Sequence, residues 1–331
     1  MTEAPAVLVT AAKLAPEAVA LLEAAGYAVP CTSAYPSEAE LLAAIARHRP
    51  VALLHRQGII TATVMDAAAP GLRMIARHGA GVDGIDLAAA AARGLTVTRA
   101  AGANSRSVAE HAMALMLALL KDLPAVADGM RGGLWEKTSR MTRDVAGTSL
   151  GIVGYGAIGS KVARLADAFG MTIAAHDPLL PPGPLPGPGE RASDLRALLA
   201  RSQVLSLHCP LDATTRGMIG AAELALLPRG AIVVHTARGG IVDEAALLAA
   251  LETGHVAWAG VDVFAEEPLD AASPLRGHPR VLPTPHLAAN TPRGAVAMST
   301  GAAESIVAVL DGCLPALPGA IVVPGGLRAA A

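Results

Sequence analysis

The chain has 331 residues, more than a usual single core accommodates, so two domains are the prior expectation. Hydrophobic residues make up 53% of it and aromatic residues only 2%, which suits helices packed on a parallel sheet and argues against stacking on single-stranded nucleic acid. Twenty-six basic and 28 acidic residues give a net charge of −2, and no basic tract indicates a nucleic acid or an anionic membrane as partner.

Cysteine usage and the N-terminal residues predict the compartment. The three cysteines are scattered and lack the spacing of metal ligands, so we expect neither a disulfide framework nor a metal site. The segment MTEAPAVLV contains no basic region followed by a long apolar one, and the longest apolar stretch, Ala112–Leu120, is too short to span a bilayer. We therefore expect an unprocessed, soluble protein of the cytoplasm.

The N-terminal part of the chain predicts a domain of alternating strands and helices. Alanine-rich stretches with helical periodicity, such as Glu38–Arg47, separate short apolar runs of the kind that form buried strands. These runs are Val7–Val9, Val51–Leu54, Met74–Ala76 and Leu95–Val97.

The segment Ser105–Leu120 is expected to form a helix that is buried on several sides. Asn104 precedes it as a good N-cap residue, and apolar residues surround almost its whole circumference. Such a helix is a deeply packed connector, part of a dimer interface, or both, and we expect a homodimer.

A glycine motif follows and predicts a dinucleotide site. The segment Ser149–Gly159, SLGIVGYGAIG, joins a short apolar run to three glycines and then to the helix-compatible Ser160–Phe169. Gly154 allows a tight turn, Gly156 lets the backbone approach a pyrophosphate, and Gly159 lets helix and strand pack closely. The N-terminus of the helix then faces the phosphates.

An acidic residue after the next strand predicts which dinucleotide binds. Asp177 follows the apolar run Met171–His176 and is placed to bond a ribose 2′-hydroxyl, which favours NAD over NADP. The proline- and glycine-rich segment Pro178–Gly189 cannot be a helix or a central strand, so we expect a stiff surface loop there.

The rest of the chain predicts a second domain of alternating strands and helices. Expected strands are Val204–Leu207, Ile232–Val234, Val256–Val261 and Arg280–Leu282, and expected helices are Asp194–Arg201, Ala221–Leu227 and Asp243–Glu252.

Polar side chains follow three successive predicted strands. Because the carboxyl ends of parallel strands form the ligand crevice, Arg238, Asp262, Glu267 and His286 should converge near the nucleotide. Arginine offers a planar cation for a carboxylate, histidine exchanges a proton near neutral pH, and a carboxylate orients the imidazole. Together they predict hydride transfer on a 2-oxo or 2-hydroxy acid.

Six motifs in order resemble the D-2-hydroxyacid dehydrogenase family over nearly the whole chain. They are GAGVDGID, GANSRSVAEHA, GYGAIG, TARGGIVDE, GVDVFAEEP and TPHLAANT. The resemblance implies an α/β protein in which an NAD-binding Rossmann domain (103–287) is inserted into a flavodoxin-like substrate domain (1–102 and 288–331). It also implies an active site in the interdomain cleft and, usually, a dimer.

The resemblance assigns roles to individual residues. Arg238 would bind and polarise the substrate, His286 would be the acid/base, and Glu267 would orient His286. NAD would be held by Val108, Gly154, Gly156, Ala157, Ile158, Gly159, Asp177, Cys209, Pro210, Thr236, Ala237 and Asp262. The substrate would contact Arg56, Arg77, Ala80, Gly81, Asn104, Arg238 and His286.

The substrate is the least specified element. Arg56 and Arg77 each follow a predicted strand and match arginines that contact the phosphate in phosphoglycerate-oxidising relatives, so a dianionic acid such as 3-phosphoglycerate is favoured. Reduction of glyoxylate or hydroxypyruvate stays open as an alternative.

Two further classes stay open beside these substrates. Some relatives bind NAD(H) but act as redox-sensing proteins that bind a partner. A nucleotide-dependent methyltransferase would share the glycine turn but leave Arg238, Glu267 and His286 unexplained. We expect no role in catalysis for His111 on the apolar helix or His208 at a strand end.

Overall fold

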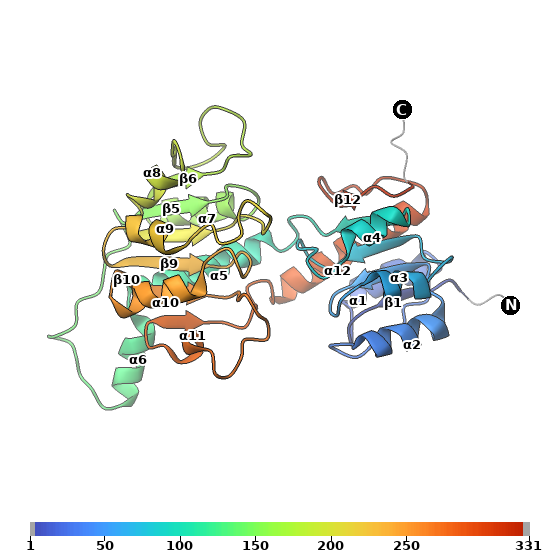
Figure 1. Cartoon of the computed structure of the whole chain (residues 1–331), viewed down its shortest axis with the longest axis horizontal. Helices are drawn as coiled ribbons and strands as arrows, with labels where there is room; N and C mark the ends of the chain where they lie inside the picture. The colour runs from blue at the N-terminus through green and yellow to red at the C-terminus, as the bar shows by residue number, and fades with distance from the viewer. Residues whose placement is uncertain (1–3, 327–331) are drawn as a thin grey trace. The chain divides into compact units, whose positions relative to one another are not determined.

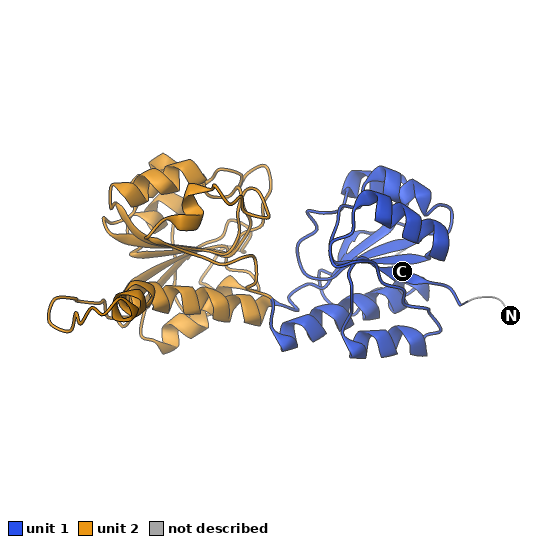
Figure 2. Cartoon of the chain, turned by 90° about the horizontal axis from the view of Figure 1, so that it is seen from below, with its two compact units in different colours: residues 1–104, 290–331 blue, residues 105–289 orange. Residues whose placement is uncertain are grey.

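The computed structural model describes residues 4–326, so the first three and last five residues of the predicted substrate domain lie outside the described residues. The chain forms two compact units (Figure 2). Unit 1 comprises residues 1–104 and 290–331, and unit 2 comprises residues 105–289. Each unit contains a sheet with helices on both faces (Figures 1 and 2).

Unit 1 contains a five-stranded sheet in the order β1-β2-β3-β4-β12. The first four strands are parallel, and the last pairs antiparallel to β4. The strands are β1 (Val7–Val9), β2 (Ala52–His55), β3 (Met74–Arg77), β4 (Thr96–Arg99) and β12 (Ile321–Val323). The helices are α1 (Pro16–Ala24), α2 (Glu38–His48), α3 (Ala62–Ala67), α4 (Leu87–Ala92) and α12 (Pro292–Leu310).

Both faces of this sheet are apolar, which explains why its strands appear in the sequence as continuous hydrophobic runs. Leu53 and Ile75 pack on the face covered by α2, α3 and α4. Leu54 and Ala76, one residue further along the same strands, pack on the face covered by α1 and α12. Successive side chains of a strand point to opposite faces, so each run supplies both layers of the core.

Unit 2 contains a seven-stranded parallel sheet in the order β11-β10-β9-β8-β5-β6-β7. Its strands are β5 (Ser149–Val153), β6 (Thr172–His176), β7 (Glu190–Arg191), β8 (Val204–Leu207), β9 (Ala231–His235), β10 (Val256–Val261) and β11 (Val281–Pro283). The chain builds outward from β5 to β7 and then continues on the other side of β5 with β8. The strand order therefore reverses between β5 and β8, which is where open α/β sheets bind ligands.

Helices cover both faces of the unit 2 sheet. One face packs against α5 and α7, and the other against α8, α9 and α10. The helices of this unit are α5 (Ser105–Leu120), α6 (Leu123–Arg131), α7 (Gly159–Ala168), α8 (Leu195–Leu199), α9 (Ala221–Leu226), α10 (Glu244–Glu252) and α11 (Pro274–Gly277).

The predicted α/β class and the expected strands are confirmed, with bounds that shift by at most two residues. The expected helix Ser105–Leu120 is α5 with the same bounds, and it packs in the core of unit 2, as a deeply packed connector would. Pro178–Gly189 forms neither a helix nor a strand. Among the residues that the structure describes, no helix is both long and apolar enough to cross a membrane.

Candidate active site

The glycine turn between β5 and α7 lies at the point where the strand order reverses. Gly154 has φ +86°, and a Cβ there would lie 2.8 Å from the Cys209 nitrogen. A Cβ on Gly159 would lie 2.0 Å from the Gly154 oxygen. A Cβ on Gly156 would meet nothing within 4 Å. Two glycines are thus required by packing, while the backbone at Gly156 faces open space of the kind that a pyrophosphate needs.

Helix α7 adds a second feature that fits an anion. Ile158 is its N-cap residue, and no side chain caps the helix there. Uncapped N–H groups and the positive end of the helix dipole attract phosphate. Ala157 and Ile158, both predicted cofactor contacts, belong to this turn, so the residues present fit a dinucleotide.

Asp177 lies one residue beyond β6, the strand next to β5. Its carboxylate accepts hydrogen bonds from the main-chain nitrogens of Tyr155 at 2.8 Å and Leu179 at 2.9 Å. The bond to Tyr155 connects Asp177 directly to the glycine turn. The acid predicted to bind the ribose is therefore held in place by the loop predicted to bind the pyrophosphate.

Of the remaining predicted cofactor contacts, Asp262 follows β10, and the others follow β8 and β9 or lie on α5. Thr236 is buried directly after β9, and its Oγ1 has no hydrogen-bond partner among the described residues, which suits a polar ligand group. Cys209 and Pro210 follow β8, and burial raises the pKa of the Cys209 thiol to about 11, so it stays protonated. Val108 and Ala237 are buried apolar residues.

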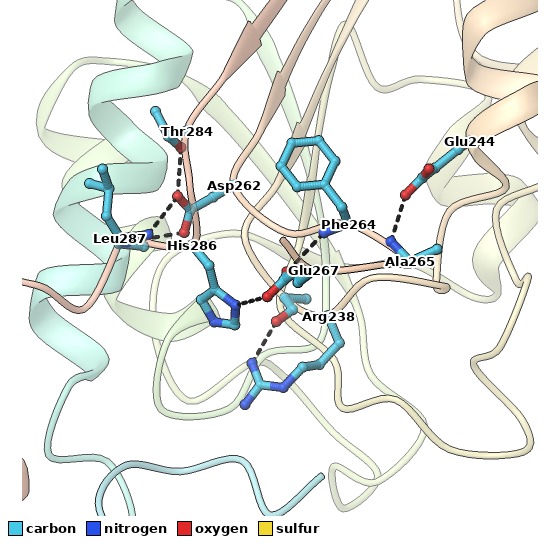
Figure 3. A network of polar contacts seen from close by, with 11 residues as sticks. Arg238, Glu244, Asp262, Phe264, Ala265, Glu267, Thr284, His286 and Leu287 are labelled. Carbon is cyan, nitrogen blue, oxygen red and sulfur yellow. Dashed lines mark hydrogen bonds and ion pairs between the residues drawn. The ribbon is translucent and has the colours of Figure 1, made fainter. Parts of the chain in front are cut away.

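His286 and Glu267 form the central pair of the candidate site (Figure 3). The His286 Nδ1 lies 2.7 Å from the Glu267 Oε2, and both side chains remain partly exposed, at 46% and 35%. With Nδ1 facing the carboxylate, Nε2 is the nitrogen of His286 that remains for a reacting group. The predicted orientation of the imidazole by Glu267 is present in the geometry.

Glu267 is held in its ionised form. Burial raises the pKa of its carboxyl, but hydrogen bonds from His286 and from the Phe264 N–H, together with the positive charge of Arg238, outweigh burial and lower the pKa overall. Figure 3 shows the Arg238 side chain next to the His286–Glu267 pair. Its guanidinium donates to the Ala237 carbonyl oxygen at 2.6 Å. Gly239 allows the loop after β9 to pass close to the loop after β10, because a Cβ on this residue would lie 1.7 Å from the Phe264 main-chain oxygen.

Asp262 is the buried residue that holds the His286 loop. Its carboxylate accepts hydrogen bonds from the Thr284 hydroxyl at 2.6 Å and from the nitrogens of Leu287 and Ala288, each at 3.0 Å. The His286 main-chain nitrogen also donates to the Asp262 main-chain oxygen at 2.8 Å. His286 has φ +49°, a conformation that costs energy in a residue with a Cβ. The surrounding bonds stabilise it.

His111 on α5 belongs to the same network, which the sequence did not predict. Its Nε2 lies 3.1 Å from the Thr284 Oγ1 and 3.6 Å from the Asp262 Oδ1. Because the Thr284 hydroxyl donates to Asp262, it accepts from His111, so His111 supports the loop that carries His286. The one signal was its place on an apolar helix, which is compatible with any buried histidine.

Unit 1 carries the predicted substrate residues at the carboxyl ends of β2 and β3. The Arg77 guanidinium donates to the carbonyl oxygens of Gly81 at 2.7 Å, Arg56 at 2.5 Å and His55 at 3.3 Å. Arg77 therefore shapes the two loops that contain Arg56 and Ala80–Gly81. Asn104 is the last residue of the first segment of unit 1.

Two buried histidines flank these arginines. Burial and the positive charge of Arg77 together lower the pKa of His55 to about 4. Burial and the charges of Arg56 and Arg77 together lower the pKa of His78 to about 4. Both imidazoles are thus neutral at pH 7, and the positive charge of this edge comes from arginine.

Comparison with known proteins agrees with this geometry. Residues 113–288 match the model of the D-isomer specific 2-hydroxyacid dehydrogenase, NAD binding domain. The D-3-phosphoglycerate dehydrogenase of Mycobacterium bovis is 40% identical over 292 residues, which cover 88% of this chain and 54% of that protein. The chain thus spans about half the length of the curated relatives it matches.

Solved structures match almost the whole chain. The TT0316 protein from Thermus thermophilus is 36% identical with a TM-score of 0.85, and the match covers 96% of this chain and all of that one. A glyoxylate reductase from Paecilomyes thermophila is 29% identical with a TM-score of 0.81, and the match covers 98% of each chain.

Proposed function

The chain belongs to the D-isomer specific 2-hydroxyacid dehydrogenase family, and we propose that it interconverts a small 2-hydroxy acid and the corresponding 2-oxo acid with NAD(H). The observation that carries this proposal is the His286–Glu267 pair beside Arg238, in the unit that also contains the glycine turn and Asp177. A protein that only binds a nucleotide has no need of a polarised histidine beside an arginine.

Each residue has a defined task in this reaction. Bound NAD supplies the nicotinamide that accepts or donates the hydride. During oxidation the Nε2 of neutral His286 takes the hydroxyl proton, and during reduction the protonated imidazole returns a proton to the carbonyl oxygen. Glu267 holds Nδ1 and stabilises the positive charge on the ring. Arg238 binds the carboxylate of the acid.

For the substrate we favour a dianionic acid such as 3-phosphoglycerate. Arg56 would bind the distal anionic group, and the main-chain nitrogens of Ala80 and Gly81 would bind the reacting carboxylate. The similarity to D-3-phosphoglycerate dehydrogenases supports this choice, and the similarity to a glyoxylate reductase supports glyoxylate or hydroxypyruvate as the alternative.

We also propose that the chain forms a homodimer through α6 and the loop that follows it, instead of through α5. The loop extends beyond the body of unit 2 in both views (Figures 1 and 2). No residue of α6 is buried, while Trp135 is 76% and Met141 94% exposed. Ion pairs of Arg140 with Asp122 and Glu136 hold the segment in shape. Exposed apolar surface on a braced segment favours a protein partner.

Two measurements test these proposals. Oxidation of NADH is followed with glyoxylate, hydroxypyruvate and phosphohydroxypyruvate, and turnover of at least one is expected. Tight NADH binding without turnover of any 2-oxo acid would instead support a sensor that binds a partner. For the dimer, sedimentation should show two copies for the unmodified chain and one for Trp135→Ser/Met141→Ser. A monomeric unmodified chain would contradict the dimer.

A further inference from the structure

The loop after Asp177 has an unusual hydrogen-bonding problem. Pro178–Gly189 contains six prolines and three glycines. Proline has a carbonyl acceptor but no N–H donor, so such a segment cannot pair its own backbone groups. It lies beside the position predicted to bind the ribose, and donors from outside the loop bond its carbonyl oxygens.

Arg191 supplies them. It lies in β7, the edge strand that follows the loop. Its Nη1 donates to the carbonyl oxygens of Pro181 at 2.5 Å and Gly183 at 3.2 Å. Its Nη2 donates to Leu180 at 2.8 Å and to Asp177 itself at 3.4 Å. One guanidinium thus gathers four carbonyls over the first half of the loop.

Tyr155 anchors the second half of the loop. Its hydroxyl donates to the Pro188 carbonyl oxygen at 2.7 Å. Tyr155 is buried and stands between Gly154 and Gly156, and its main-chain nitrogen donates to the Asp177 carboxylate. The loop is therefore connected to the glycine turn at one end and to Asp177 at the other.

We propose that Arg191 is a positioning residue that sets the preference for NAD over NADP through this loop. Binding of a 2′-phosphate at this place needs a cationic partner, commonly an arginine near the ribose acid. Arg191 lies close enough to the ribose acid to bond the Asp177 carbonyl oxygen, yet the acceptors of its N–H groups are main-chain oxygens and not a ligand. It thereby holds the main chain at Asp177, whose carboxylate accepts from the Tyr155 and Leu179 N–H groups, and its own N–H groups stay bonded to carbonyl oxygens instead of turning to a phosphate.

This inference rests on the proposed NAD site, and direct binding measurements separate the two. Kd values for NADH and NADPH are measured by fluorescence, and KM for NAD and kcat by turnover. For Arg191→Ala we expect a Kd for NADH about tenfold higher, a smaller ratio of NADPH to NADH Kd, and a kcat at saturating cofactor within about twofold. Arg191→Lys should fall between, because an ammonium cannot span four carbonyls.

Matched variants control for damage to the fold. Arg201→Ala removes only an exposed ion pair with Glu190, the residue beside Arg191, and should leave both Kd values unchanged. Tyr155→Phe removes only the hydroxyl bond to Pro188 and should raise the Kd for NADH a few fold. It remains informative if Arg191→Ala does not fold.

The outcomes distinguish the two proposals. No binding of NADH to the unmodified chain would overturn the NAD site itself. Tight NADH binding with an unchanged NADPH to NADH ratio in Arg191→Lys and Tyr155→Phe would overturn the role of Arg191 alone. A loss of kcat and thermal stability at constant ratio would show Arg191 to be merely structural, and would also overturn it.

Discussion

The carboxyl ends of the two sheets are organised by opposite charges. In unit 2, Asp177, Asp262 and Glu267 each accept hydrogen bonds from main-chain N–H groups of neighbouring loops. In unit 1, Arg77 donates to main-chain carbonyl oxygens of the loops after β2 and β3. The same architecture thus builds an acidic edge that orients an imidazole and a cationic edge suited to an anion.

The difference shows that loop-holding residues also determine the chemistry of an edge. Glu267 fixes its own loop through Phe264 and has its second oxygen on His286, so one carboxylate holds both the backbone and the reacting group. Arg77 bonds the Arg56 carbonyl, which directs a loop that carries a second cation. Variants on the two edges should therefore fail in different ways.

The largest effect is expected from His286→Ala. Without the acid/base at Nε2, kcat should fall on the order of a hundredfold or more, while the Kd for NADH stays near that of the unmodified chain. Steady-state kinetics and NADH fluorescence measure the two quantities. His48→Ala, on α2 of unit 1, is the control. If kcat stayed within a few fold of the original, His286 would not be the acid/base and the reaction would not take place at this edge of unit 2.

Asp262→Asn should damage the acidic edge next most strongly. In the unmodified chain both carboxylate oxygens of Asp262 accept hydrogen bonds, whereas the asparagine amide would place an NH₂ group, itself a donor, against one set of these donors. The free energy of unfolding should therefore fall by about 1.5–3 kcal/mol. Chemical denaturation measures the loss, and kcat should fall with it because the His286 loop loosens. Unchanged stability and kcat would show that the carboxylate charge does not hold this loop.

Arg56→Ala tests the cationic edge, with an effect of about tenfold. Loss of one charge-assisted contact should raise KM for a dianionic 2-oxo acid about tenfold but leave KM for glyoxylate nearly constant. Arg77→Met should raise KM for both, because it releases the loops that contain Ala80 and Gly81. An equal effect of Arg56→Ala on both substrates would favour a glyoxylate or hydroxypyruvate reductase.

Acid stability depends on buried histidines at both edges. Burial lowers the pKa of His235 to about 4 and of His208 to about 3, and the pKa values of His55 and His78 lie near 4. In the unfolded chain these imidazoles titrate near the ordinary 6.5, so the unfolded state binds more protons between about pH 6.5 and 4. Stability is therefore full above pH 6.5 and falls as the pH drops through this window.

Single substitutions show whether both units contribute to this loss. His55→Asn in unit 1 and His235→Asn in unit 2 should each reduce the slope of melting temperature against pH between pH 6.5 and 5. Half-buried His278, whose Nδ1 accepts from the Arg280 nitrogen, provides the control His278→Asn. An unaltered slope in both variants would mean that other groups cause the acid loss.

The sequence by itself determined every strand except β7 and β12, and it predicted the glycine turn and the polar residues that follow the strands of unit 2. Parallel strands buried on both faces need continuous apolar runs, so β8 and β10 were predicted with their observed bounds. The turn at Gly154 and Gly159 was predictable from the sequence, because a residue with a Cβ does not fit at either position and the glycines therefore mark the turn. The order of the polar segments placed Glu267 and His286 at one edge of the sheet.

Tertiary structure alone decided what holds these residues in place. The strands β7 and β12 are two and three residues long and exist through pairing at sheet edges, which leaves no pattern of their own. Arg191 and Arg77 donate to main-chain carbonyl oxygens, a group that every residue carries. Since such bonds place no demand on residue type at the acceptor, the sequence contains the donor but not the identity of what it binds.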